Sequence, residues 1–446
     1  MNTAFRLSVV ATALSCTVAT PVFAQDTHAS TEEELATMRS QLRTLVTRID
    51  QLENELAETK AANGAVIAAN AQSAAPTADP APPGELTDSD GWSFKPRGRL
   101  MFDAGTISAP ETTGADDGFG NEVRRARLGA SGDIPGGFGY KFELDFAGNE
   151  VEAADAYLSY ADGPLEVIVG HHNNFQSLEE LTSSLHTSFI ERAAFTDAFG
   201  FERRIGISGS YESGIVRAQA GVFTDNFDDT GTDNRSIDGR LVLMPEMGEA
   251  QLHFGGSLHY NKFGEDDASA RYRQRPLVHF ASTRFVDSGD LGAESEFGLG
   301  MEAAAISGPF HAAAEGFWQN VDMPIAANPT FFGGYAEVGY FLTNGDTRGY
   351  KGGKFDRTKP VNPVGEGGLG SLQVNLRYDH LDLSDAGIIG GVQNGYQASL
   401  VWKPTDYTLF SLNYGRMDYE DAVLPTAEGD TNYGVDVVGV RAQVDF

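Results

Sequence analysis

The chain has 446 residues, of which 21% are charged, and its formal net charge is −31 at pH 7. This negative charge argues against a nucleic-acid partner, because phosphate backbones bind basic surfaces. The only cysteine, Cys16, excludes a disulfide scaffold. We find no catalytic triad, phosphate-binding loop, dinucleotide motif or metal-ligand spacing in a convincing context, so the sequence predicts neither an enzyme nor a cofactor or metal site.

Residues 1–24 have the pattern of a secretory signal peptide. Arg6 precedes an apolar run over residues 7–18, and residues 22–24 (Val-Phe-Ala) offer a small-residue cleavage pattern. A lipoprotein signal that uses Cys16 is the alternative, but residues 13–15 place their large aliphatic residue in an unusual position. Because no run of eighteen apolar residues occurs elsewhere, we expect a periplasmic, secreted or outer-membrane protein without a transmembrane helix.

Residues 25–60 predict an α-helical coiled coil. Apolar side chains recur at alternating spacings of three and four residues, and Thr31 with Glu34 forms a capping box before them. The apolar positions are Leu35, Met38, Leu42, Leu45, Ile49, Leu52 and Leu56. A single amphipathic helix lying on another surface is the alternative. Residues 61–91 are rich in Ala and Pro and predict a linker, so the segment at 31–60 could trimerise the chain or contact the cell wall.

Residues 92–446 predict one domain made of antiparallel strands. The last strand shows the pattern most clearly, because Val440, Val444 and Phe446 alternate with Arg441 and Asp445. An apolar face that ends on an aromatic residue is typical of a strand that closes a barrel in lipid. Other segments place charged residues on their second face, which a sealed apolar core would not accept but a water-filled lumen would.

Seventeen period-two segments occur in this domain. Bacterial barrels have an even number of strands, so we assign residues 271–285 to a long external loop, 262–293, and predict a 16-stranded antiparallel transmembrane β-barrel. The connections 173–199 and 344–370 are also long, the second on the side where turns are short. Connections of this length usually carry function, so we expect all three to fold into or across the lumen.

Several stretches in this order resemble the phosphate- and polyphosphate-selective porins (O/P type) of Gram-negative outer membranes. They are Arg124–Gly129 (RRARLG), Tyr140–Phe146 (YKFELDF), Asp155–Leu158 (DAYL), Ser177–Ser184 (SLEELTSS), Phe189–Arg192 (FIER), Gly339–Thr343 (GYFLT), Arg377–Asp379 (RYD) and Leu381–Leu383 (LDL). The resemblance covers essentially the whole barrel domain. It implies a sixteen-stranded homotrimer in the outer membrane, with inward-folded loops and often an amino-terminal coiled coil.

The resemblance also implies an anion path. Its constriction would include the paired arginines Arg124 and Arg125, the acidic residue Asp155 and the hydroxyl pair Ser183 and Ser184. The remaining positions implied are Arg127 and an arginine ladder of Arg271, Arg273 and Arg275. Guanidinium groups bind phosphate with two parallel hydrogen bonds, and a row of weak sites lets an ion enter and leave. Lys95, Arg97 and Arg99 share one strand face and either extend this path or anchor to lipid phosphate.

One segment departs from the family pattern. Family members commonly carry a lysine and a proline before the Ser-Leu-Glu-Glu run, where this chain has His171, His172, Asn173 and Asn174. A basic stretch later in the chain restores the anion preference if it reaches the lumen, and otherwise forms a solvated periplasmic turn. It consists of Arg348, Lys351, Lys354, Arg357 and Lys359. The sequence thus favours a porin for small hydrophilic solutes, with anions such as phosphate foremost. The alternatives are a general porin, an envelope tether and an enzyme built on the barrel wall.

Overall fold

The computed structural model describes Gln51 and residues 85–446 except 112–114, 116, 149, 225–232 and 265–268. Residues 81–446 form one compact unit, and residues 1–80 form a second unit of which only Gln51 is described. The predicted signal peptide (1–24), the rest of the predicted coiled coil (25–60) and most of the predicted linker (61–91) lie outside the described residues. These assignments therefore stay predictions.

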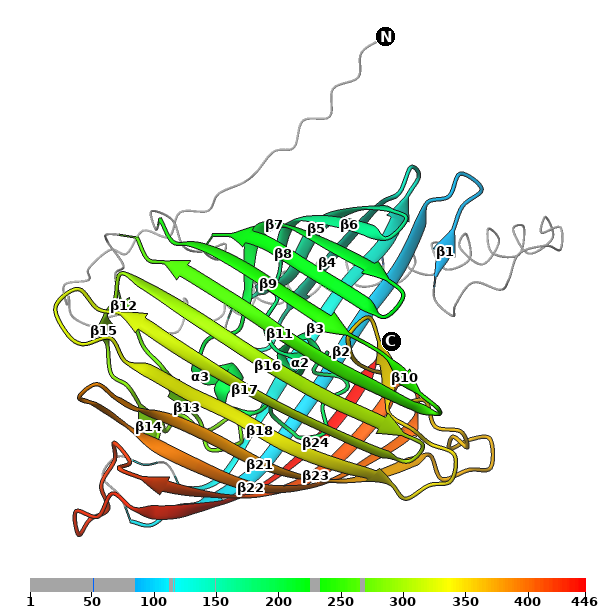
Figure 1. The fold of residues 1–446 in the computed structure, drawn as a ribbon. Coiled ribbons are helices and arrows are strands. Elements are labelled where there is room, and N and C mark those ends of the chain that lie inside the picture. The colour runs from blue at the N-terminus through cyan, green and yellow to red at the C-terminus, as the bar shows by residue number, and fades with distance from the viewer. Residues whose placement is uncertain are drawn as a thin grey trace, which may run out of the picture. The chain divides into compact units, whose positions relative to one another are not determined.

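Sixteen antiparallel strands pair side by side in chain order and close into a barrel (Figure 1). They are β2 (Ser93–Ser108), β3 (Gly118–Ile134), β4 (Phe138–Asp145), β5 (Glu152–Asp162), β6 (Leu165–Asn173), β7 (Arg203–Ser213), β8 (Val216–Phe223), β9 (Arg235–Leu243), β11 (Ala250–Lys262), β16 (Ser295–Ser307), β17 (Phe310–Asp322), β18 (Thr330–Phe341), β21 (Ser371–Asp385), β22 (Ile388–Thr405), β23 (Thr408–Glu420) and β24 (Tyr433–Asp445). The two-residue strands β1 (Leu86–Thr87) and β10 (Glu246–Met247) pair with β2 and β11. The predicted count of sixteen wall strands is confirmed.

The carboxyl-terminal strand closes the barrel, as the sequence predicts. β24 pairs with β23 on one side and with β2 on the other. The final residue extends this seam, since the backbone N–H of Phe446 donates to the carbonyl of Gly98 at 3.0 Å and the N–H of Gly98 donates back at 3.1 Å. The Phe446 ring lies against Gly98, where a Cβ atom would come within 2.1 Å of the ring. A larger residue at position 98 would therefore have to displace the Phe446 ring.

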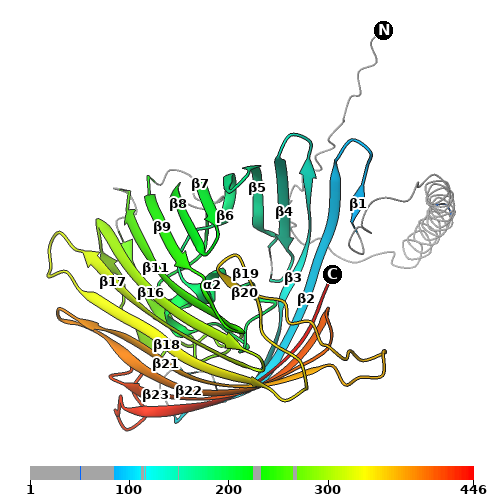
Figure 2. The same cartoon turned by 45° about the vertical axis from the view of Figure 1, so that its right-hand side comes forward.

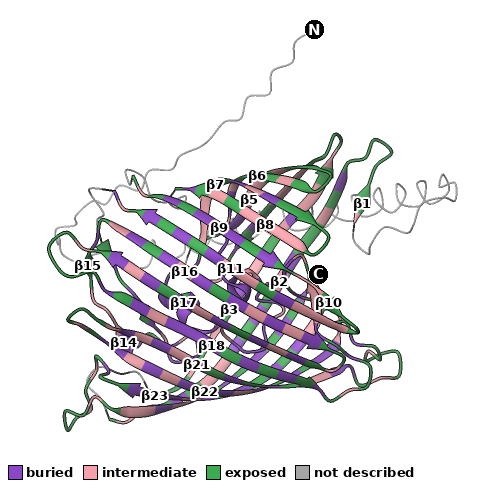
Figure 3. Cartoon of the chain, in the orientation of Figure 1, coloured by how far each residue is buried: buried purple, intermediate pink, exposed green. Residues whose placement is uncertain are grey.

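Buried and exposed residues alternate along the wall strands (Figure 3). Outward side chains are apolar, and aromatic pairs from neighbouring strands lie near the short turns. Examples are Phe310 with Tyr340, whose ring centroids are 4.6 Å apart, and Trp402 with Phe410 at 5.5 Å. Apolar outer faces bounded by aromatic residues are the mark of a barrel that sits in lipid. No helix in the described part of the chain is long and apolar enough to cross a membrane.

All three long connections fold into the lumen, as predicted. The first, residues 174–202, carries α2 (Leu178–Leu181) and α3 (Ala194–Ala198). The second, residues 263–294, carries β12 (Ser269–Ala270), β13 (Arg273–Gln274), β14 (Val286–Asp287) and β15 (Leu291–Gly292) instead of a wall strand. The third contains the hairpin of β19 (Gly349–Lys351) and β20 (Lys354–Asp356), which lies inside the barrel beside α2 (Figure 2). These segments leave only part of the lumen open.

Candidate functional site

The connection 174–202, which we call the constriction loop, is fastened to one side of the barrel wall by buried polar groups. The carboxylate of Glu315 on β17 accepts hydrogen bonds from the backbone N–H groups of Leu178 at 2.8 Å and Glu179 at 2.7 Å. On β21, Arg377 contacts the Glu179 carboxylate at 2.7 Å, and Asp379 accepts from the N–H of Ala194 at 2.9 Å. Aromatic packing of α3 against β17 and β18 completes the seal on this side.

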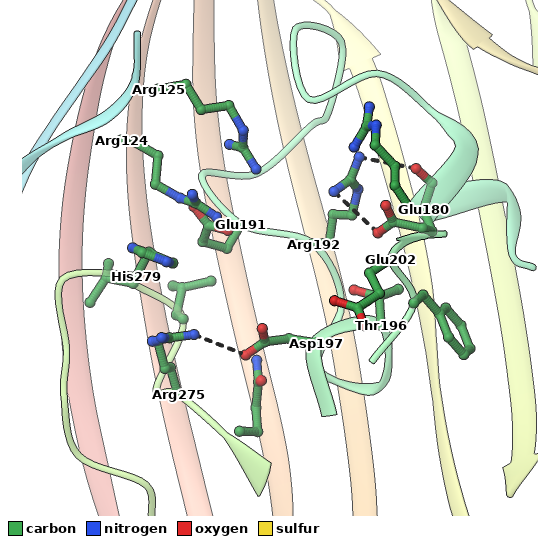
Figure 4. Close-up of a pocket in the computed structure, with 15 residues that line it drawn as sticks. Arg124, Arg125, Glu180, Glu191, Arg192, Thr196, Asp197, Glu202, Arg275 and His279 are labelled. Carbon is green, nitrogen blue, oxygen red and sulfur yellow. Dashed lines mark hydrogen bonds and ion pairs between the residues drawn. The ribbon is translucent and has the colours of Figure 1, made fainter. Parts of the chain in front are cut away.

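A β-bulge directs two adjacent arginines into the lumen on the opposite side. Neighbouring residues of a regular strand point to opposite faces. In the pairing of β2 with β3, however, Met101 is opposite Arg125 and Phe102 is opposite Val123, so Arg124 is an extra residue. Such a bulge re-aims side chains locally. Both guanidinium groups consequently face the constriction loop (Figure 4).

The two adjacent arginines differ in their partners. Arg124 holds the loop carboxylate of Glu191 with two hydrogen bonds, Nε to Oε1 at 2.8 Å and Nη2 to Oε2 at 3.2 Å. Among the described residues, no carboxylate lies within ion-pair distance of Arg125, and its Nη1 instead contacts the sulfur of Met101 at 3.9 Å. Arg125 therefore has hydrogen-bond donors free for a solute.

Four neighbouring cavities lie in the lumen; the wall residues of three of them come from β2–β8, and the fourth, the vestibule, is lined mainly by the two inward connections 174–202 and 263–294. The vestibule is lined by residues 197–204, 269–275 and their neighbours, and it shares Arg275 with the constriction chamber, which contains Arg124 and Glu191. The constriction chamber shares Arg125 and Arg192 with the inner chamber, lined also by Ser183 and Ser184. Lys141 and Tyr157 then line both the inner chamber and the exit chamber near the short turns. Shared lining residues place these cavities next to one another, and we refer to this row of neighbouring cavities as the path.

Basic side chains outnumber carboxylates in each of the four chambers, although the whole chain is acidic. The inner chamber shows the largest excess, with eight basic residues against Asp155, Glu166 and Glu180. Those eight are Arg99, Arg125, Arg127, Lys141, Arg192, Arg203, Arg217 and Lys354. The vestibule has five arginines against three carboxylates, and the constriction chamber has five against four. The lining of these chambers is thus basic in spite of the acidic net charge of the chain.

The structure places all nine predicted residues along this path. Arg127 pairs with Glu143 at 3.1 Å and Asp145 at 2.7 Å, and Asp155 accepts from Lys141 at 2.5 Å and Arg203 at 2.8 Å. Ser184 accepts a hydrogen bond from Arg99 at 3.1 Å, and Ser183 also lines the inner chamber. Arg271, Arg273 and Arg275 line the vestibule; Arg271 pairs with Asp287 at 2.7 Å and Arg275 with Asp197 at 3.4 Å.

The structure also places five of the other basic residues for which the sequence left alternatives. Arg99 lines the inner chamber, and Lys95 and Arg97 line the exit chamber, so these three face the path rather than lipid. Lys354 projects from the β19–β20 hairpin into the inner chamber, while Arg348 donates to the carbonyl of His186 in the constriction loop. Arg203 was missed in the sequence. Its position directly after the inward loop, at the start of a strand, is the signal that could have identified it.

Two carboxylates of the constriction loop have opposite pKa shifts. Burial raises the pKa of Glu180 above its ordinary value, and the nearby Arg192 only partly opposes this effect. Burial also acts to raise the pKa of Glu191, but Arg124, which approaches to 2.8 Å, and Arg441 at 3.1 Å outweigh it and hold the pKa well below its usual range. Glu191 is therefore an anion at neutral pH and occupies the guanidinium of Arg124.

Comparison with known proteins agrees with this architecture. A protein of Caulobacter vibrioides that carries no functional name is 44% identical over 451 residues, which cover 94% of this chain and 91% of that protein. The anion-selective porin from Comamonas acidovorans has a similar fold, with a TM-score of 0.54, 16% identity, and coverage of 80% of this chain and 100% of that chain. The trimer form of OmpT, an outer membrane protein of Vibrio cholerae, gives a TM-score of 0.50 at 12% identity, with 80% and 100% coverage.

The family model described as phosphate-selective porin O and P matches residues 94–446. This range contains the barrel wall from the second residue of β2 onward and the three inward connections. The chain therefore belongs to the phosphate-selective porin O and P family of outer-membrane porins.

Proposed function

We propose that this porin is a passive diffusion channel that prefers small anions over cations of similar size. The carrying observation is the excess of basic side chains in every chamber of the path, centred on Arg125, whose guanidinium has no carboxylate partner among the described residues. An anion that enters would meet guanidinium groups in sequence, each of which offers hydrogen bonds that replace part of its hydration shell.

Phosphate is one candidate solute, and it would reach Arg125 from the vestibule arginines and leave through the inner chamber. The lysine expected before the constriction loop is absent, but Lys354 and Arg203 place positive charge in the inner chamber. Because the basic residues are mostly paired with carboxylates, we infer a channel that passes several small anions and binds phosphate only weakly. A homotrimer in the outer membrane is part of the proposal, and the trimer form of the Vibrio cholerae porin supports it.

Substitution of Arg125 tests this proposal. Purified wild-type, Arg125→Gln and Arg125→Lys proteins would be inserted into planar bilayers that separate KCl solutions of different concentration. We expect the wild-type reversal potential to show anion preference, Arg125→Gln to lose most of it, and Arg125→Lys to retain it, since charge rather than fork geometry sets selectivity for chloride. Cation preference of the wild-type channel would refute anion transport, and absence of conductance would refute the channel itself.

A further inference from the structure

One carboxylate in the constriction chamber binds an arginine in the way a permeating anion would. The Glu191 carboxylate and the Arg124 guanidinium lie fork to fork, with contacts of 2.8 and 3.2 Å. This bidentate geometry is the one that a free carboxylate or phosphate adopts on arginine. Both side chains keep some contact with the lumen, at 16% exposure for Arg124 and 20% for Glu191. The contact therefore lies within reach of solutes in the path.

The backbone on both sides of this carboxylate is held in place. The N–H of Ile190 donates to Oδ1 of Asn413 on β23 at 3.1 Å, and the carbonyl of Glu191 accepts from Arg377 at 3.3 Å. A second arginine, Arg441, contacts the carboxylate at 3.1 Å, but Asp103 already binds Arg441 with two hydrogen bonds of 2.7 Å. Glu191 is thus positioned chiefly to occupy Arg124.

We infer that Glu191 is an internal ligand of Arg124, and that it sets how tightly the constriction binds the permeating anion. This inference rests on the proposed anion transport. With Arg124 occupied, an anion in the chamber finds one unpaired guanidinium, that of Arg125, instead of two on adjacent residues. One fork gives weak binding and rapid release, which a channel needs for conduction. Glu191 is accordingly a specificity-determining residue that trades affinity for flux.

The test is Glu191→Gln, measured as block of chloride current by added inorganic phosphate and as the chloride concentration at half-maximal conductance. The neutral amide keeps one acceptor oxygen but removes the negative charge and the second acceptor, so that a solute anion competes more easily for Arg124 beside Arg125. We expect two concentrations to fall about tenfold, a change of about 1.4 kcal/mol in binding free energy: the phosphate concentration that blocks half of the chloride current, and the chloride concentration at half-maximal conductance. The maximal chloride current should fall as well.

Two further variants separate this mechanism from a loosened loop or a simple change of charge. Arg124→Gln breaks the same contact but also removes the guanidinium. If a displaced loop causes the effect of Glu191→Gln, Arg124→Gln should show the same effect. If Glu191 acts as an internal ligand, Arg124→Gln should show no tighter binding of phosphate or chloride. Asp197→Asn removes one carboxylate from the same chamber but frees only Arg275, which it contacts singly at 3.4 Å. We expect a much smaller change for this control.

The outcomes separate the two proposals. Tightening in Glu191→Gln alone supports the internal ligand. Equal effects in Glu191→Gln and Asp197→Asn, or in Glu191→Gln and Arg124→Gln, would overturn it and leave anion transport intact. The wild-type reversal potential is recorded in the same membranes, and cation preference there would overturn the proposed function instead.

Discussion

The two sides of the lumen have opposite charge and opposite packing. On the β2–β8 side, the wall carries the arginines and lysines of the path, and their side chains face open chambers. On the β9–β23 side, buried carboxylates predominate, including Glu296, Glu302, Glu315 and Glu337, and the inward loops cover them. Because a buried carboxylate needs hydrogen bonds or a counter-charge, this acidic side holds the loops. Inward-facing side chains of the wall strands thus hold the loops on one side of the lumen and line the path on the other.

The largest effect is expected from breaking the anchor at Arg377. This fully buried guanidinium pairs with Glu179 of the constriction loop at 2.7 Å and with Glu337 of β18 at 2.8 Å. Arg377→Leu would leave the buried Glu179 without its counter-charge and Glu337 with only Ser188 and His311 as partners among the described residues, at a cost of about 3–5 kcal/mol. We expect a displaced loop, seen as larger and noisier single-channel currents, together with a lower temperature of barrel unfolding on denaturing gels. If the Arg377→Leu channel had the same quiet single-channel conductance as the wild type, the position of the loop would not depend on these ion pairs.

A smaller disturbance is expected from Glu315→Gln, which keeps the shape of the side chain. The variant weakens the hydrogen bonds that two backbone N–H groups of the loop make to the carboxylate, at 2.8 and 2.7 Å. Hydrogen bonds to charged groups contribute about 1.5–3 kcal/mol each. We therefore expect brief closures or flicker in single-channel records of a stably folded barrel. An unchanged record would mean that the neutral amide holds the loop equally well.

On the path side, Lys354 links anion preference to pH. Its side chain is exposed to a narrow lumen, and this enclosure, with Arg217, Lys141 and Arg240 nearby, lowers its pKa from 10.5 to about 8. The ammonium is charged below that pH and neutral above it, so anion preference should decline as pH rises through about 8. We expect the anion preference of Lys354→Gln to be weaker than that of the wild type by a factor of about two to three at most. We also expect it not to decline as the pH rises through about 8.

Lys351 provides the matched control for that variant. It pairs with Lys354 across the turn of the β19–β20 hairpin, is exposed, and lines none of the four chambers described above. Lys351→Gln should therefore leave both the preference and its pH dependence nearly unchanged. Equal effects of the two substitutions would indicate a general field from the hairpin instead of a local charge in the inner chamber.

The smallest effect is expected for acidic residues at the external rim. Asp421 and Asp430 lie in the exposed connection between β23 and β24. Neither residue lines any of the four chambers, and salt at 0.1 M screens exposed charges with a Debye length of about 10 Å. Asp421→Asn and Asp430→Asn should thus change the reversal potential by no more than a few millivolts, measured in the same KCl gradient. A large change would place this loop over the entrance.

Much of this architecture is readable in the sequence because barrel strands repeat a period of two. The last strand shows it clearly, since Val440, Val444 and Phe446 face outward and Arg441 and Asp445 face inward as predicted. Loop length identified the three inward connections. These features depend on local patterns and chain length, which the sequence contains directly.

Other features depend on contacts between distant segments and leave no local pattern. The family resemblance implies that both Arg124 and Arg125 lie at the constriction, but adjacent residues of a regular strand face opposite ways, and only the pairing with β2 reveals the bulge that turns both inward. Likewise, the sequence could not decide whether Lys354 lies in the lumen, because that depends on how a 27-residue connection (344–370) folds. The separation of the lumen into an anchoring side and a path side is also a property of the closed barrel.

The central claim, that the lumen and not the net charge governs selectivity, is tested most directly by the wild-type reversal potential in KCl gradients at low and high ionic strength. The net charge of −31 would by itself attract cations, most strongly at low salt. We predict anion preference at both ionic strengths, because the basic chambers surround the ion throughout its passage. Cation preference that fades with added salt would contradict the account.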